Sequence, residues 1–120
     1  MDQIQKRKQY DLESRTFQFA QDTRHFVKKI PKTIINIDDI KQLLRSSGSV
    51  GANYIEANES LSKKDFIMRI MICRKEAKET EYWYKLIEVG NEELEKERKN
   101  LIQEVIELRK IFGAILEKSK

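Results

Sequence analysis

Hydrophobic residues recur at spacings of three and four over most of this chain, the pattern of helices that bury one face. The first such segment ends at Pro31, because proline disfavours the helical conformation in the residue before it. Ser62 and Asn91 have the side chains that cap a helix start. We therefore expect an all-α, antiparallel up-down four-helix bundle in one domain, residues 1–120, with helices at about 11–30, 39–59, 62–89 and 92–118.

The middle of the second expected helix contains residues that usually form loops. Gly48 and Gly51 lie among serines, and each glycine costs about 1 kcal/mol relative to alanine inside a helix. The apolar spacing nevertheless continues without a change of phase, so we predict helix, with small residues allowing a neighbouring helix to approach closely. A phosphate-binding loop would need GxGxxG or GxxxxGK[ST], and neither occurs. The inward side is expected to carry Ile40, Leu43, Leu44, Ser47, Val50, Gly51, Tyr54 and Ile55.

The helices expected at 62–89 and 92–118 have more apolar residues than one core-facing stripe uses. Either the core is wider than usual, or a second stripe covers another surface. We favour self-association into a homo-oligomeric ring. The residues expected at the oligomer interface are Ile67, Met71, Trp83, Ile102 and Ile106.

The composition changes this picture little. Charged residues make up 37% of the 120 positions, with 4 glycines and 1 proline, which favours a few long helices with solvated faces. The N-terminus lacks an apolar signal segment, and no stretch approaches 18 uncharged apolar residues, so we expect a cytoplasmic protein without a membrane partner. Cys73 lies at a core position and is expected to be a small buried residue rather than a reactive thiol.

Catalysis finds little support in the sequence. A di-iron or di-manganese bundle needs two Glu-x-x-His motifs and two further glutamates. The chain has one histidine, His25, with Asp22 three residues before it and no second such motif. We therefore expect no catalytic residues, no metal and no cofactor.

Several polar residues fall on apolar faces of the second and third expected helices. A bundle interior tolerates charged groups when they are paired, so Arg45 or Arg74 bound to Glu56 or Glu79 would form a buried network that sets helix register. The same network could instead shape a polar patch at an oligomer pore or a partner site. Its candidate members are Arg45, Asn53, Glu56, Arg74, Glu76 and Glu79.

The positive charge is concentrated at the start of the chain, although the net charge is only +4. A solvated helix face would explain this, and so would a patch that binds phosphates non-specifically, which oligomerisation would multiply. RNA is therefore a candidate partner, and a scaffold that binds only protein is the alternative. The candidate nucleic-acid-binding residues are Lys6, Arg7, Lys8, Arg15, Arg24, Lys28, Lys29 and Lys32.

Several segments together suggest a family. They are residues 42–57, reading QLLRSSGSVGANYIEA, residues 62–66, reading SKKDF, residues 75–79, reading KEAKE, and Tyr82-Trp83, with Arg15-Thr16, Phe19-Ala20 and Ile30-Pro31-Lys32 upstream. Over nearly its whole length the chain resembles the four-helix bundle proteins of the 23S rRNA intervening-sequence family. The resemblance implies an up-down bundle that assembles as a ring, usually a pentamer, with no established enzymatic activity.

A more distant resemblance is to the accessory proteins of diversity-generating retroelements. Those proteins form basic pentamers that bind a reverse transcriptase and nucleic acid. This second resemblance implies a role as an accessory subunit, for example of a reverse transcriptase.

Overall fold

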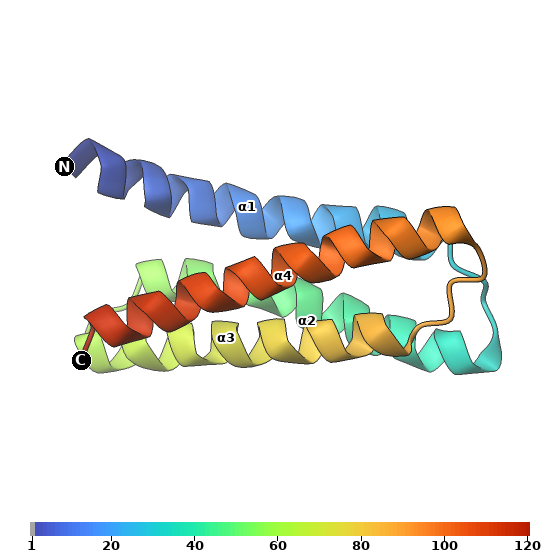
Figure 1. Cartoon of the computed structure of the whole chain (residues 1–120). Helices are drawn as coiled ribbons and strands as arrows, with labels where there is room; N and C mark the ends of the chain where they lie inside the picture. Colours follow the sequence, from blue (N-terminus) through green and yellow to red (C-terminus); the bar gives the residue numbers. More distant parts are fainter. Residues whose placement is uncertain (1) are drawn as a thin grey trace.

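The chain folds into four long α-helices and, over residues 2–120, no strand. The structure is a computed structural model that describes the backbone of residues 2–120 and the side chains of residues 12–120. Figure 1 shows the chain turning back at each of its three connections. The helices are α1 (Asp2–Lys28), α2 (Ile34–Asn58), α3 (Lys63–Leu86) and α4 (Glu92–Lys118).

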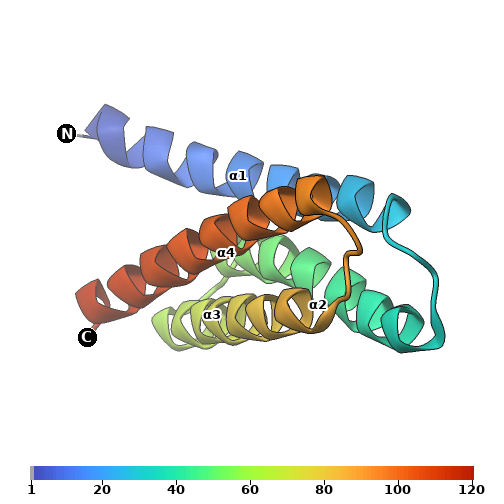
Figure 2. The same ribbon diagram turned by 45° about the vertical axis from the view of Figure 1, so that its right-hand side comes forward.

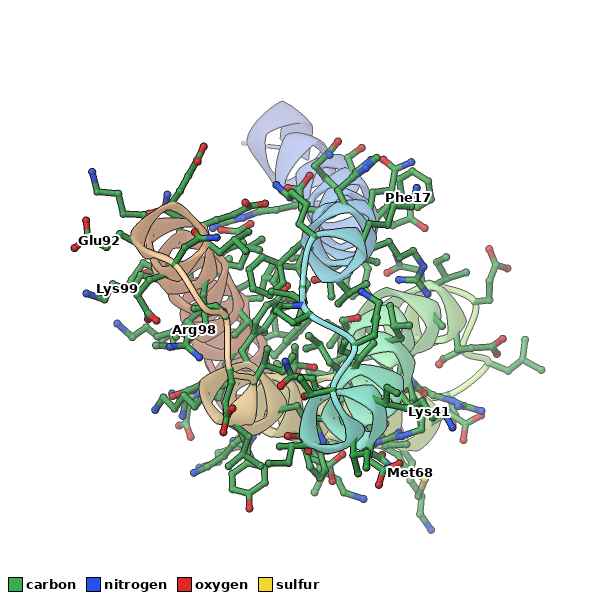
Figure 3. The ribbon with its side chains drawn as sticks, turned by 90° about the vertical axis from the view of Figure 1, so that its right-hand side faces the viewer. Phe17, Lys41, Met68, Glu92, Arg98 and Lys99 are labelled. Carbon is green, nitrogen blue, oxygen red and sulfur yellow. The ribbon has the colours of Figure 1, made fainter. Side chains whose placement is uncertain are left out.

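Each helix packs against its neighbours in sequence, and α1 also contacts α4. The contact between α2 and α3 is the most extensive and that between α1 and α4 the least. Figure 2 shows α1 diverging from α4 toward its N-terminus, and Figure 3, which looks along the bundle, shows the helices around a common core. The all-α, four-helix prediction is confirmed.

Aromatic side chains fill the middle of this core. Tyr84 is fully buried, with its ring centroid 5.4 Å from that of Phe26 and 6.2 Å from that of Phe19. Its hydroxyl donates a hydrogen bond of 2.6 Å to Thr23 Oγ1, which satisfies a polar group that would otherwise destabilise the core. Burial raises the pKa of the Tyr84 phenol well above its usual value, so this proton is retained at any physiological pH.

The prediction that Gly48 and Gly51 lie within a helix is confirmed, as is close packing at the second of them. A Cβ atom on Gly51 would lie 3.0 Å from Thr16 Oγ1 and 3.3 Å from Thr16 Cβ. On the other side of α2, Thr80 Oγ1 donates to Ser46 Oγ at 2.8 Å. Small residues on α2 therefore let α1 and α3 approach closely. The inward position expected for Ile55 is wrong, because 53% of this side chain is exposed.

Two helices begin earlier than expected. Helix α1 starts at Asp2 rather than near residue 11. Helix α2 starts at Ile34 rather than 39, because Thr33 caps it by accepting a hydrogen bond from the Asn36 amide at 3.1 Å. Ile34 and Ile35 thus form the first turn of α2, where both are exposed.

The side chain of Asn36 joins two connections of the bundle. Its amide nitrogen donates to the carbonyl oxygens of Pro31, at 3.0 Å, and Glu88, at 2.8 Å. Its carbonyl oxygen accepts from the Glu88 amide at 3.0 Å. Asn36 is completely buried, and we call this set of hydrogen bonds the Asn36 clamp. It ties the α1–α2 connection to the α3–α4 connection at one end of the molecule.

Helix α3 ends at Leu86, three residues before the expected end at 89. The chain then becomes extended at Ile87, and both Ile87 and Val89 bury their side chains in this connection. Arg98 of α4 satisfies the freed carbonyl groups by donating to Tyr84 and Ile87. Gly90, at φ +86°, provides the left-handed conformation that the turn requires, and Asn91 caps α4. Within the described part of the chain, no helix is long and apolar enough to span a membrane.

Candidate functional site

Three members of the expected polar network meet between α2 and α3. Arg45 donates from Nη1 to Glu76 at 3.1 Å and from Nη2 to Glu79 at 2.9 Å. Glu76 is only 7% exposed, whereas about half of the Arg45 side chain remains in solvent. The hydrogen bond to Glu79 raises the pKa of Arg45. The cluster is therefore half-exposed rather than fully buried, and it fixes α2 against α3.

The other expected members of the network are separated from this cluster. Asn53 accepts from Arg69 Nη1 at 3.1 Å, a partner that the apolar periodicity did not single out. Glu56 and Arg74 are exposed and contribute no contact to the cluster. Of the alternative pairings expected, the one between Arg45 and Glu79 forms, and those of Glu56 and of Arg74 do not.

The basic residues expected to bind nucleic acid have mixed surroundings. Arg15 donates from Nε and Nη2 to Glu104 of α4, each at 2.8 Å, and Lys29 lies 2.6 Å from Glu97 of the same helix. Lys32 Nζ donates to the carbonyl oxygens of Val27 and Ile30, each at 2.6 Å. Arg15 and Lys29 thus bind the first part of the bundle to α4, whereas Lys32 bonds only to residues just before it in the chain. The side chains of Lys6, Arg7 and Lys8 lie outside the described residues.

Arg24 and Lys28 differ from Arg15 and Lys29, although Arg24 Nη1 donates to the carbonyl oxygen of Ala20 at 3.0 Å. Both are exposed, and neither forms an ion pair within residues 12–120. Phe17 lies on the same side of α1, where it is 63% exposed and points away from the bundle in Figure 3. Residues 17, 24 and 28 are spaced by seven and four, which aligns them along one edge of the helix.

The outer face of α3 has the most distinctive surface of the molecule. A shallow groove there has an apolar floor and a rim whose charges are all positive, and no acidic residue lines it. We call it the α3 groove. Met68 and Met71 are each about half exposed in its floor, and Met68 points away from the bundle in Figure 3. The groove is lined by Lys64, Ile67, Met68, Met71, Ile72, Arg74, Lys75, Lys78 and Arg109.

The residues expected at an oligomer interface are only partly brought together. Ile67 and Met71 line the α3 groove, whereas Trp83 lines a second hollow with Tyr82 and Arg45, toward α2. Ile102 and Ile106 are partly buried on α4, and Ile102 packs against the core. Periodicity identified surplus apolar residues but did not show that the core takes up some of them.

The single histidine and the single cysteine have different surroundings. His25 is exposed, and Cys73 is fully buried with its Sγ 3.4 Å from the carbonyl oxygen of Val50. Burial raises the pKa of the Cys73 thiol to about 12, so the thiolate is scarce at neutral pH. Among the side chains of residues 12–120, no three His, Cys, Asp or Glu groups cluster as metal ligands do.

These features define a small all-α bundle protein with a cationic, partly apolar outer face on its third helix. The sequence profile of the family described as 23S rRNA-intervening sequence protein matches residues 8–114. The chain belongs to this family.

One solved structure is similar to this chain in both sequence and fold. It is the crystal structure of a protein of unknown function from the S23 ribosomal protein family, from Bacteroides thetaiotaomicron VPI-5482. The two share 31% sequence identity and superpose with a TM-score of 0.75, over 88% of this chain and 97% of the other. A comparison with curated proteins gives no match.

Proposed function

We propose that this chain is a non-enzymatic bundle that acts as a cytoplasmic homo-oligomer. The observation that carries the proposal is the outer face of α3, where Met68, Met71, Tyr82 and Leu86 are between 43% and 57% exposed. Large apolar side chains that recur along one exposed helix face are typical of protein interfaces. Association would cover it, and the family resemblance favours five copies.

Light scattering at micromolar concentration tests the assembly. The expected mass is a multiple of the 14.3 kDa chain, with five copies favoured. A mass of one chain at every concentration would contradict the proposal.

The absence of enzymatic activity is part of the same proposal. It is supported by the exposure of His25 and by the burial of the Cys73 thiol, which leave no paired base and nucleophile in the described residues. Metal analysis of the purified protein is expected to find no stoichiometric iron, manganese or zinc. A bound metal pair at Glu56 and Glu79 would overturn this part.

A second candidate function is non-specific binding of RNA, favoured by Arg24 and Lys28. Their charges are not neutralised within residues 12–120, and the exposed ring of Phe17 beside them could stack on a base. In an assembly, each copy would add the same edge of α1. Several phosphates would then be contacted at once, and the binding would be electrostatic.

The RNA test compares the native chain with a variant carrying Arg24→Glu and Lys28→Glu across a salt series. Lys29 and Lys32 stay unchanged because Lys29 bonds to Glu97, and Lys32 bonds to the carbonyl groups of Val27 and Ile30. Each phosphate contacted on single-stranded RNA adds about −0.7 to the slope of log affinity against log salt. The variant is expected to bind more weakly with a shallower slope.

The matched control for this test carries Lys96→Glu and Lys99→Glu, which make the same charge change on exposed residues of α4. A native slope near zero, or equal losses in both variants, would reject the α1 edge as an RNA site. The remaining function would then be a scaffold that binds only protein, such as an accessory subunit of a reverse transcriptase.

A further inference from the structure

The outer side of α2 near its C-terminus has the opposite charge from the α3 groove. Glu56 and Glu59 are exposed and form no ion pair within residues 12–120. Ala52 and Ile55 are exposed beside them, and Leu61, in the turn that follows, is 99% exposed. No lysine or arginine occurs from residue 46 to residue 62. We call Ala52, Ile55, Glu56, Glu59 and Leu61 the α2 end surface.

The α3 groove is the complement of this surface. Lys64, Arg74, Lys75 and Lys78 of its rim are exposed and form no ion pair within residues 12–120. Its floor of isoleucine and methionine side chains is apolar and deformable, and such surfaces accommodate a helix. A helix that offers aliphatic side chains and carboxylates on one face would cover the floor and neutralise the rim.

We propose that the α3 groove of one copy binds the α2 end surface of a second copy of this chain. The inference rests on the proposed self-association and names the two surfaces that meet. A second copy fits better than RNA, because phosphates could neutralise the rim but RNA bases stack on aromatic rings, and no aromatic residue among residues 12–120 lines the groove. The α2 end surface supplies apolar groups as well as negative charge.

The positions of the two surfaces allow a closed ring. Helix α2 ends at Asn58 and α3 begins at Lys63, so the α2 end surface and the start of the α3 groove lie at the same end of the bundle, and the groove continues along α3 to Lys78. The two surfaces belong to different helices of the same chain. A contact between two different surfaces of the same chain is head-to-tail, and it closes into a ring when a constant rotation relates successive copies.

Charge reversal tests which surfaces meet. A groove variant carries Lys75→Glu and Lys78→Glu, and an end-surface variant carries Glu56→Lys and Glu59→Lys. Each places like charges across the proposed contact, so association is expected to weaken at least about 100-fold. Light scattering should then give 14.3 kDa at concentrations where the native chain is assembled. A chain with all four reversals restores opposite charges and is expected to assemble again.

The controls separate this inference from the proposal on which it rests. The Lys96→Glu and Lys99→Glu variant is expected to assemble like the native chain, and circular dichroism checks that every variant is folded. A monomeric native chain would reject self-association itself. If the native chain assembles and neither double reversal weakens the assembly, the α3 groove and the α2 end surface are not the contact surfaces. Self-association itself would still hold in that case.

Two further outcomes would also overturn the inference. If both double reversals dissociate but the fourfold reversal does not reassemble, the two surfaces contact something other than each other. If the groove variant loses RNA binding and keeps its oligomeric mass, the α3 groove is an RNA surface.

Discussion

At the scale of single residues, the close approach of α1 and α2 depends on the absence of one methyl group. Gly51 faces Thr16, which is 1% exposed and donates its hydroxyl hydrogen bond to the carbonyl of Glu13 at 3.0 Å. The neighbour of a new Cβ is therefore a branched side chain held in place. It could move only if α1 moved with it.

We predict that Gly51→Ala destabilises the protein even though alanine is the better helix former. The gain in helix propensity is about 1 kcal/mol, whereas overpacking typically costs about 1–3 kcal/mol. The control is Gly113→Ala in α4, where a Cβ would meet nothing within 4 Å. Only the gain in helix propensity then remains. In urea unfolding, Gly51→Ala should lower the midpoint and Gly113→Ala should raise it. If both variants raised the urea midpoint by the same amount, α1 would be free to shift away from the new methyl group.

A second prediction at this scale concerns Cys73. Its pKa is about 12 in the folded protein because burial disfavours the thiolate, against an ordinary value of 9.0. A pKa raised by folding contributes stability below pH 9, and this stability is lost as the pH rises toward 12. At pH 8, a thiol reagent should therefore modify Cys73 only at the rate of unfolding. Rapid modification of the native protein would show that the α2–α3 contact opens locally.

At the scale of helices, the Asn36 clamp decides where two connections lie. Replacing Asn36 by alanine would remove three part-buried hydrogen bonds, two to the carbonyl groups of Pro31 and Glu88 and one from the amide of Glu88. Each such hydrogen bond contributes about 0.5–1.5 kcal/mol net. We predict that Asn36→Ala lowers the free energy of unfolding by at least about 2 kcal/mol, measured in urea.

The control for the clamp is Thr33→Ala, which removes only a helix cap and should cost about 1 kcal/mol. Hydrogen exchange should show faster exchange of the Glu88 amide in Asn36→Ala and not in Thr33→Ala. An equal loss of stability in the two variants would mean that water replaces the clamp.

Much of the arrangement into helices was predictable, because local signals fix it. Ser62 and Asn91 cap α3 and α4 as expected, and apolar spacing correctly carried α2 through Gly48 and Gly51. The start of α2 was predicted five residues too late, at 39 rather than 34, which left Asn36 outside the helix. In the structure Asn36 is buried against Glu88, 52 positions away, a contact that no local pattern reveals.

The candidate surfaces were less predictable than the helices for the same reason. Three of the cations around α1 are neutralised or bonded at the bundle surface, and the partners of Arg15 and Lys29 come from α4. The sequence shows each charge but not which charges meet. The α3 groove depends in turn on which apolar residues the core leaves exposed, which only the packing of all four helices decides.

At the scale of the whole molecule, association and folding should be coupled. If copies bind through the α3 groove, the folded state gains stability from a partner that the unfolded chain cannot bind. We predict that the melting temperature of the native chain rises with protein concentration over a 100-fold range. The groove variant with Lys75→Glu and Lys78→Glu should melt at one temperature throughout. A native melting temperature that does not change would contradict a stabilising contact there.

The two ends of the bundle differ in a way that affects its response to mechanical force. The start of α1 and the end of α4 lie at the same end of the bundle, and the Asn36 clamp lies at the other (Figure 1). Tension applied between the two termini would pull α1 and α4 apart across the helix axes, where their contact is least extensive. The α1–α4 contact would therefore separate first, from the end with the termini toward the connections that the three hydrogen bonds of Asn36 tie together.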